Sequence, residues 1–174
     1  MAKTGKSGGG LKRSPIHLLH RALQLSLDFY AQETGAGGVT QRQYAVLCAV
    51  AADDGLSQAR LVKATGIDRS TVAELVARMS GLGLLERQRA LGDGRANTVR
   101  LTERGRTLLE QTEPRVVAAD KRLLKLLPSK KRDDFLRLLQ DLVKEGGAPA
   151  AEAAAKAAPR KKAREPRPEA TAAK

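Results

Sequence analysis

The apolar residues of the segment GIDRSTVAELVARM, residues 66–79, recur at the i, i+3, i+4, i+7 spacing of one helix face. Arg69 stands with Ser70 and Thr71 in the first turn of this helix, and Arg78 stands in its last turn. A helix that only packs against a core has no need of this polar set, whereas a helix that enters a DNA groove does. The pattern predicts a short amphipathic helix whose buried face consists of Val72, Leu75, Val76 and Met79.

The first predicted helix has a broad apolar face. Ser14 and Pro15 predict its N-cap and its first position, and the run IHLLHRALQLSLDFYAQE follows. Two neighbouring apolar stripes give this helix more apolar surface than its own domain is expected to cover, which predicts a dimer. The stripes are Leu18, Ala22, Leu25 and Phe29, and beside them Leu19, Leu23 and Tyr30.

Two short helices joined by a glycine turn follow a second helix. Thr40 and Gln43 have the capping-box spacing that begins the second helix. Ser57 caps the short helix SQARLVKAT, and Asp68 caps the segment described above. This pair, with Gly66 at the turn, is the helix-turn-helix pattern. The inner face of the second helix is expected to consist of Tyr44, Leu47, Cys48 and Ala51.

A β-hairpin is predicted after the helix-turn-helix. Residues 84–90 have the pattern of a strand, LGDGR that of a tight turn, and residues 97–101 that of the returning strand. Val99 and Leu101 alternate with polar neighbours, as expected for a strand with one buried face. The hairpin therefore has the form of a wing with a basic tip.

Two more helices are predicted after the hairpin. Thr102 caps a long helix, and Pro114 inside it should bend or break it. Pro128 and Ser129 open a last helix, which Gly146 and Gly147 should stop. One face of that last helix carries Phe135, Leu138, Leu139 and Leu142.

This order of elements resembles the MarR family of winged helix-turn-helix regulators over about residues 15–145. The motifs LVKATGIDRSTVAELVARMSGLGLLER and DGRANTVRLTERG carry the resemblance. It implies a mainly α fold with a β-hairpin wing, in which a winged helix-turn-helix lobe adjoins a helical dimerisation lobe. It also implies a homodimer that binds a palindromic operator. One departure is that wing tips of this family often carry two adjacent basic residues, whereas here Gly94 precedes Arg95.

The expected domain organisation is a single MarR-type domain between two basic tails. Residues 1–13 form a basic disordered arm, residues 14–146 form the domain, and residues 147–174 form a disordered tail rich in Ala, Pro, Lys and Arg. Within the domain, residues 40–101 are the winged helix-turn-helix. The dimerisation helices occupy residues 14–35 and 102–146.

The net charge of +13 on 174 residues indicates a polyanionic partner such as double-stranded DNA. The tails either solubilise the protein or attract DNA phosphate without sequence preference. No apolar run of membrane-spanning length and no secretory leader are found, and Cys48 is the only cysteine, so a cytoplasmic protein is expected. Aromatic residues make up 2% of the chain, which disfavours a single-strand binder.

The candidate DNA-contacting residues lie in the helix-turn-helix and in the wing. Arg95 at the hairpin tip is suited to a narrow minor groove, and Asp93 is expected to orient it or another wing arginine. Two recognition helices of a dimer would contact half-sites of an inverted repeat about 10 bp apart. The remaining candidates are Gln58, Arg69, Ser70, Thr71 and Arg78.

The resemblance also implies control by a small ligand, commonly an aromatic acid or its coenzyme A thioester, bound between the two lobes. His17, His20 and Arg21 are candidates for holding the acidic group, and Tyr44 for the aromatic wall. Gln24 shares a helix face with His17 and Arg21, which favours one shared anion-binding site. Release of the operator by such a ligand would make the protein a repressor.

Two alternatives remain open. Cys48 could sense oxidants, although its place on an inner helix face favours an inert thiol, and the chain has no second cysteine to resolve it. The basic tails would also suit an architectural DNA-binding protein with little sequence preference. An enzyme is not expected, nor is a metal or another cofactor, because the sequence has no phosphate loop, metal-ligand spacing or catalytic triad.

Overall fold

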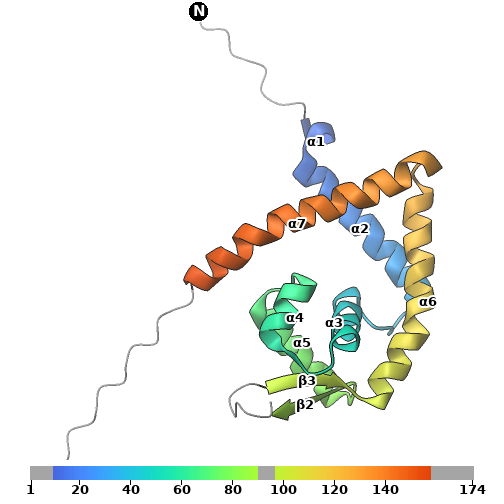
Figure 1. Ribbon diagram of the computed structural model, residues 1–174. Helices are drawn as coiled ribbons and strands as arrows, with labels where there is room; N and C mark the ends of the chain where they lie inside the picture. The colour runs from blue at the N-terminus through green and yellow to red at the C-terminus, as the bar shows by residue number, and fades with distance from the viewer. Residues whose placement is uncertain (1–9, 90–96, 158–174) are drawn as a thin grey trace, which may run out of the picture. The chain divides into compact units, whose positions relative to one another are not determined.

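The computed structural model describes residues 10–89 and 97–157 of the chain. It divides into two compact units, residues 1–136 and 137–174, and the first contains all the elements named below except most of the last helix. The described elements are α1 (Gly10–Arg13), α2 (Pro15–Thr34), α3 (Gln41–Ala52), β1 (Leu56–Ser57), α4 (Gln58–Thr65), α5 (Arg69–Gly81), β2 (Leu85–Arg89), β3 (Asn97–Leu101), α6 (Glu103–Lys125), a 3₁₀ turn (Ser129–Lys131) and α7 (Arg132–Ala157) (Figure 1).

The N-caps expected from the sequence are confirmed. In each case a side-chain oxygen accepts a hydrogen bond from the backbone N–H three residues later, which satisfies one of the donors left free at a helix start. Gly66 ends α4 in the left-handed conformation, with φ 67°, where a side chain would be strained. The capping residues are Ser14, Thr40, Ser57, Asp68 and Thr102.

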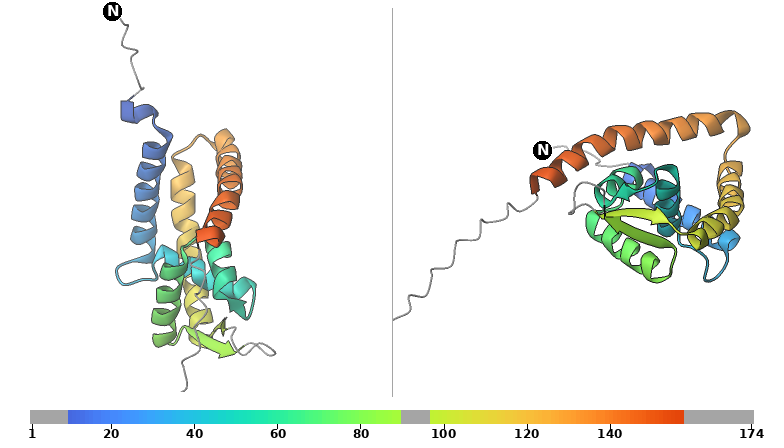
Figure 2. Two further views of the ribbon diagram at one scale, coloured as in Figure 1. Left: turned by 90° about the vertical axis from the view of Figure 1, so that its left-hand side faces the viewer. Right: turned by 60° about the horizontal axis from the view of Figure 1, so that its bottom comes forward.

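The winged helix-turn-helix forms its own hydrophobic core. The strands make a sheet of order β1-β3-β2, in which β3 pairs antiparallel with both neighbours. The two longer strands, β2 and β3, lie beside α5 in the winged lobe (Figure 2). The predicted hairpin is confirmed, but β1 was not predicted, because a two-residue strand forms only through its distant pairing with β3. The fully buried side chains are Val46, Leu47, Val50, Leu61, Val72, Val76, Met79 and Val99.

The second helix buries a different face from the one expected. Leu47 is buried in α3, but Ala51 is exposed, and Tyr44 and Cys48 are only half-buried. Val46 and Val50 are buried in the core, and Ala51 is not. The reason is that α3 packs on two sides: one face meets α4 and β3, and another meets α6.

Two expectations about the helical ends are wrong, and one about a helix interior is wrong in part. The expected bend or break at Pro114 is not a break, since helix α6 runs continuously past Pro114 to Lys125. Helix α7 continues past Gly146 and Gly147 to Ala157, since the alanine-rich segment that follows has high helix propensity. Gly10–Arg13 form a helical turn inside the arm expected to be disordered, while residues 1–9 and 158–174 lie outside the described residues.

Helix α2 packs along α6 (Figure 1). Several side chains join the two helices. Arg122 donates to Glu33 Oε1 at 2.7 Å and to Gln32 Oε1 at 2.8 Å. Its guanidinium also lies 4.6 Å from the centre of the Phe29 ring. Arg115 donates to the backbone oxygen of Thr34 at 3.1 Å. These contacts form the α2–α6 clamp.

Candidate functional site

The start of α5 is held in place by its own cap. The Asp68 carboxylate accepts from Ser70 Oγ at 2.6 Å and from the Thr71 N–H at 2.9 Å. The Ser70 hydroxyl first, and then the Thr71 N–H, hold the pKa of Asp68 well below its usual range. Ser70 therefore uses its proton within the cap and offers DNA mainly an acceptor, whereas the neighbouring Arg69 is exposed.

The exposed face of α5 is opposite to its core face. Val72, Val76 and Met79 are buried, as predicted, and Leu75 is half-buried. Arg69 and Arg78 are nine residues apart, which is about two and a half helical turns, so they lie on opposite flanks of the exposed face. The middle of this face carries Ser70, Glu74, Ala77 and Gly81, all exposed.

Glu74 was missed by the sequence prediction, which on this helix considered only basic and hydroxyl residues. It is exposed on α5, four residues after Ser70 and four before Arg78. A glutamate in this position repels phosphate but accepts a hydrogen bond from the amino group of cytosine. The spacing of apolar residues along α5 could have identified Glu74, because residues out of phase with the core-facing positions face the solvent.

Two ion pairs border the helix-turn-helix. Arg60 on α4 pairs with Asp53, and Arg100 on β3 lies 3.5 Å from Asp54. Neither arginine was predicted as a functional residue, and both lie at the edge of the lobe that carries α5. Gln58, which was predicted, is half-buried in the first turn of α4.

The tip of the wing lies outside the described residues, and with it Asp93 and Arg95. The described base of the hairpin pairs Glu86 with Arg100 and Arg87 with Val99. Arg87 is exposed on β2. The described base of the hairpin thus carries both a basic and an acidic exposed side chain on β2, Arg87 and Glu86.

A pocket of about 300 Å³ lies between α2, α3 and α6. It is bordered by the helices that the clamp joins and by the first turn of α3, which belongs to the helix-turn-helix lobe. The pocket therefore lies between the helix pair α2 and α6 and the helix-turn-helix lobe. The lining residues are Leu23, Ser26, Leu27, Tyr30, Gln41, Tyr44, Val116, Ala119, Asp120 and Leu123.

Of the five residues predicted to bind a ligand, only Tyr44 lines this pocket. His17 is half-buried, and His20, Arg21 and Gln24 are exposed on the N-terminal half of α2. His20 precedes the lining residues Leu23, Leu27 and Tyr30 by 3, 7 and 10 positions, so it continues the same helical stripe beyond the pocket. The structure therefore separates the aromatic wall from the predicted cations.

Cys48 lies beside the pocket residue Tyr44. Burial raises the pKa of the Cys48 thiol, against the smaller effect of its hydrogen bond with Tyr44. Burial, and then the same hydrogen bond, raise the pKa of Tyr44. A thiol kept protonated reacts slowly with oxidants, which argues against redox sensing by Cys48.

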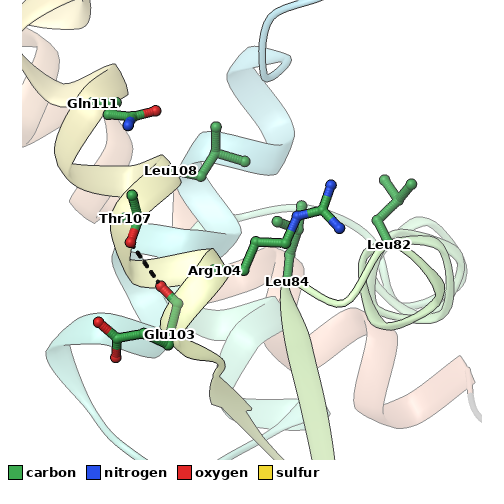
Figure 3. A pocket seen from close by; sticks show the side chains of 7 residues that line it. All are labelled: Leu82, Leu84, Glu103, Arg104, Thr107, Leu108 and Gln111. Carbon is green, nitrogen blue, oxygen red and sulfur yellow. Dashed lines mark hydrogen bonds between the residues drawn. The ribbon is translucent and has the colours of Figure 1, made fainter.

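A second, more open hollow of about 540 Å³ lies where α5, β2 and α6 meet (Figure 3). Leu82, Leu84 and Leu108 provide its apolar surface, and the Arg104 side chain extends past Leu84 towards Leu82 (Figure 3). Unlike the pocket between α2, α3 and α6, this hollow is lined by a cationic side chain, Arg104, but the carboxylate of Glu103 lines it as well.

No helix among the described residues is both long and apolar enough to cross a membrane. No group of three or more histidine, cysteine, aspartate or glutamate side chains within the described ranges is arranged to hold a metal ion.

Comparison with known proteins gives the family. The family model described as MarR family matches residues 37–96. The HTH-type transcriptional repressor NicR of Pseudomonas putida is 33% identical over 119 residues, which cover 64% of this chain and 75% of NicR.

Solved structures agree with this relationship. BpsR of Bordetella bronchiseptica, whose DNA binding is regulated by 6-hydroxynicotinic acid, is 30% identical, with a TM-score of 0.72 over 75% of this chain and 94% of BpsR. PcaV of Streptomyces coelicolor, solved with its natural ligand, is 30% identical, with a TM-score of 0.73 over 79% of this chain and 97% of PcaV. Both the fold and the sequence thus lead to one conclusion: the chain belongs to the MarR family and is a DNA-binding transcriptional regulator.

Proposed function

We propose that the protein is a homodimeric repressor that binds an inverted-repeat operator and releases it when an aromatic acid, or its coenzyme A thioester, binds. The exposed polar face of α5 within a winged helix-turn-helix is the observation that carries the DNA-binding part. Arg69 and Arg78 on its flanks contact the two walls of the major groove, while Ser70 and Thr71 lie nearest the bases. Gln58 contacts the DNA backbone, and Arg95 enters the minor groove, with Asp93 orienting Arg95 or another wing arginine.

The dimer is supported by apolar surface that the protomer leaves uncovered. In α2, Ile16 is 82% exposed, and Leu18, Leu19 and Leu23 are each about half exposed. Exposed apolar patches of this kind mark protein interfaces. A second copy of the chain provides the matching surface, and two-fold symmetry then sets the recognition helices about 10 bp apart on an inverted repeat.

The effector site is the pocket between α2, α3 and α6. It adjoins the α2–α6 clamp on one side and the helix-turn-helix lobe on the other. An aromatic ring beside Tyr44, with its acidic group near His17, His20, Arg21 or Gln24, would change how the two parts pack. BpsR, whose DNA binding responds to 6-hydroxynicotinic acid, supports an effector of this class. A ligand that binds only the conformation unable to bind the operator would shift the population away from the operator-bound form.

An architectural DNA-binding protein is the second candidate, supported by the net charge of +13. The two functions differ in specificity, because phosphate contacts alone carry no sequence information. A DNase footprint of the full-length dimer on DNA upstream of its own gene, compared with random DNA at the same salt concentration, separates them. The repressor hypothesis predicts a protected inverted repeat. Uniform protection of both DNAs would favour the architectural protein and contradict our proposal.

A further inference from the structure

The middle of the exposed face of α5 combines one long acidic side chain with residues whose side chains are short or absent. Ser70, Glu74, Ala77 and Gly81 are all exposed, and their spacing of four, three and four residues places them in one stripe along the helix. Ala77 has one methyl group and Gly81 has no side chain, so the helix can approach another surface closely there. Glu74 is therefore the one side chain of this stripe that reaches far into such a surface.

The side chains of the stripe offer hydrogen-bond acceptors and no free donor. Ser70 Oγ donates its proton to Asp68 Oδ1 at 2.6 Å, which leaves the lone pairs of the hydroxyl for a partner. An ionised glutamate carboxylate accepts hydrogen bonds and donates none. The side chains of Ala77 and Gly81 contain no polar atom. A surface that matches this stripe must therefore provide the donors itself.

The Glu74 carboxylate is not used within the protomer. Arg78 lies four residues further along α5, at the spacing of a helical ion pair. The ion pairs of the described residues nevertheless join other arginines to other carboxylates, and Glu74 makes no hydrogen bond or ion pair with a described residue. A free carboxylate on a helix that faces DNA is repelled by the phosphates. Its position in the middle of the face, between the arginine flanks, favours a contact with the bases instead.

Only two bases provide a donor at the floor of the major groove. Adenine presents its N6 amino group beside the acceptor N7, which repels a carboxylate, whereas cytosine presents its N4 amino group alone. Guanine and thymine present acceptors only. We infer that Glu74 determines specificity by accepting a hydrogen bond from the N4 amino group of one cytosine in each operator half-site. The inference rests on the proposed binding of α5 in the major groove and specifies the base that it reads.

Selection of binding sites from random duplex DNA by the full-length protein, at one salt concentration, tests this inference. We expect the wild type to select an inverted repeat with cytosine at one position of each half-site. Glu74→Gln should select adenine at that position, because glutamine bonds to both N6 and N7 of adenine. Glu74→Ala should lose the preference at that position and keep it elsewhere. Glu110→Gln, which replaces an exposed carboxylate on α6, is the matched control and should select the wild-type sequence.

A modified operator tests the hydrogen bond itself and does not depend on how the variants fold. In N4-methylcytosine a methyl group replaces the amino hydrogen that faces the major groove, while the hydrogen that pairs with guanine stays. In anisotropy titrations we expect this base to weaken binding of the wild type about fivefold or more, and binding of Glu74→Ala less than about twofold.

The outcomes separate this inference from the proposed function. An unchanged affinity of the wild type for the modified operator would overturn the inference. The same selected sequence for wild type, Glu74→Gln and Glu74→Ala would overturn it as well, and sequence-specific binding would still stand. A wild-type selection that enriches no sequence would instead refute the proposed operator binding, and the inference with it.

Discussion

Arg69 and Arg78 lie on opposite flanks of α5, so in the DNA complex that we propose each has its own effect on recognition. Arg69 stands beside the capped N-terminus, whose free N–H groups attract phosphate. Arg78 stands in the last turn, on the side of the helix that also carries Thr71. Between them, Glu74 is the acidic group that prevents the exposed face from being uniformly attractive to phosphate.

Replacing either arginine should weaken operator binding. We expect Arg69→Ala and Arg78→Ala each to cost about 1–3 kcal/mol of binding free energy. Replacing an arginine that contacts phosphate also lowers the salt slope of binding by about one. Replacing an arginine that contacts a base lowers the discrimination between the operator and a mutated operator. Fluorescence anisotropy titrations at several salt concentrations measure both quantities. Lys125→Ala, at the far end of α6, is the matched control, and equal losses in all three variants would refute the assignment.

The Asp68 cap predicts a pH dependence of stability. The pKa of this carboxyl is lower in the folded protein than its ordinary value of 3.8, so its contribution is complete above that value and is lost as the pH falls. Asp68→Asn keeps a capping side chain but cannot ionise. We expect urea unfolding to show a larger advantage of wild type over this variant at pH 7 than at pH 3. An equal difference at both pH values would contradict the role given to the charge.

At the scale of elements, the junction of α5, β2 and α6 links the recognition helix to the wing. The backbone N–H of Leu84 donates to Met79, and its carbonyl accepts from Thr102 at 3.2 Å. Thr102 Oγ donates to the backbone oxygen of Gly83 at 2.6 Å while capping α6. Gly105 completes the junction, because a Cβ there would overlap the carbonyl oxygen of Leu84.

This close approach makes Gly105 a sensitive position. Gly105→Ala should destabilise the fold by about 2 kcal/mol or more, because backbone atoms must move to admit the methyl group. Gly81→Ala is the control, since a Cβ at that helical glycine would meet no atom within 4 Å. Urea unfolding of both variants tests this contrast. Similar stabilities would show that the junction is looser than the structure indicates.

The helix caps and the helix-turn-helix could be predicted from the sequence because they depend on residues three or four positions apart. The α2–α6 clamp could not, since Arg122 and Glu33 are 89 residues apart and meet only in the folded chain. For the same reason the sequence could not show which of the candidate ligand residues on α2 and α3 line the pocket. The face of α2 that meets α3 and α6 is decided by tertiary packing, which also brings Asp120 to the pocket.

For the whole molecule, the basic charge is spread beyond the lobe that reads DNA. Residues 158–174 hold six basic and two acidic residues and no large apolar side chain. A composition of this kind favours attraction to phosphate over burial of apolar surface. We therefore expect affinity and specificity to have separate sources, the first partly in the tail and the second in α5 and the wing.

Deleting residues 158–174 should separate these two sources. We expect unchanged thermal stability and unchanged preference for the operator over random DNA, with weaker binding to random DNA and a smaller salt slope. Thermal melting and anisotropy titrations at two salt concentrations measure these effects. A large fall in melting temperature would show that the segment packs against the fold.

The most direct test of the account is whether ligand and operator oppose each other through the whole molecule. Calorimetry with 4-hydroxybenzoate, with and without saturating operator DNA, measures this coupling, since linkage requires each to weaken the other by the same factor. We predict that operator lowers ligand affinity at least about fivefold, and that Arg21→Ala or His20→Ala lowers ligand affinity of the free protein. Equal ligand affinity with and without operator would contradict the account of an operator released by its effector.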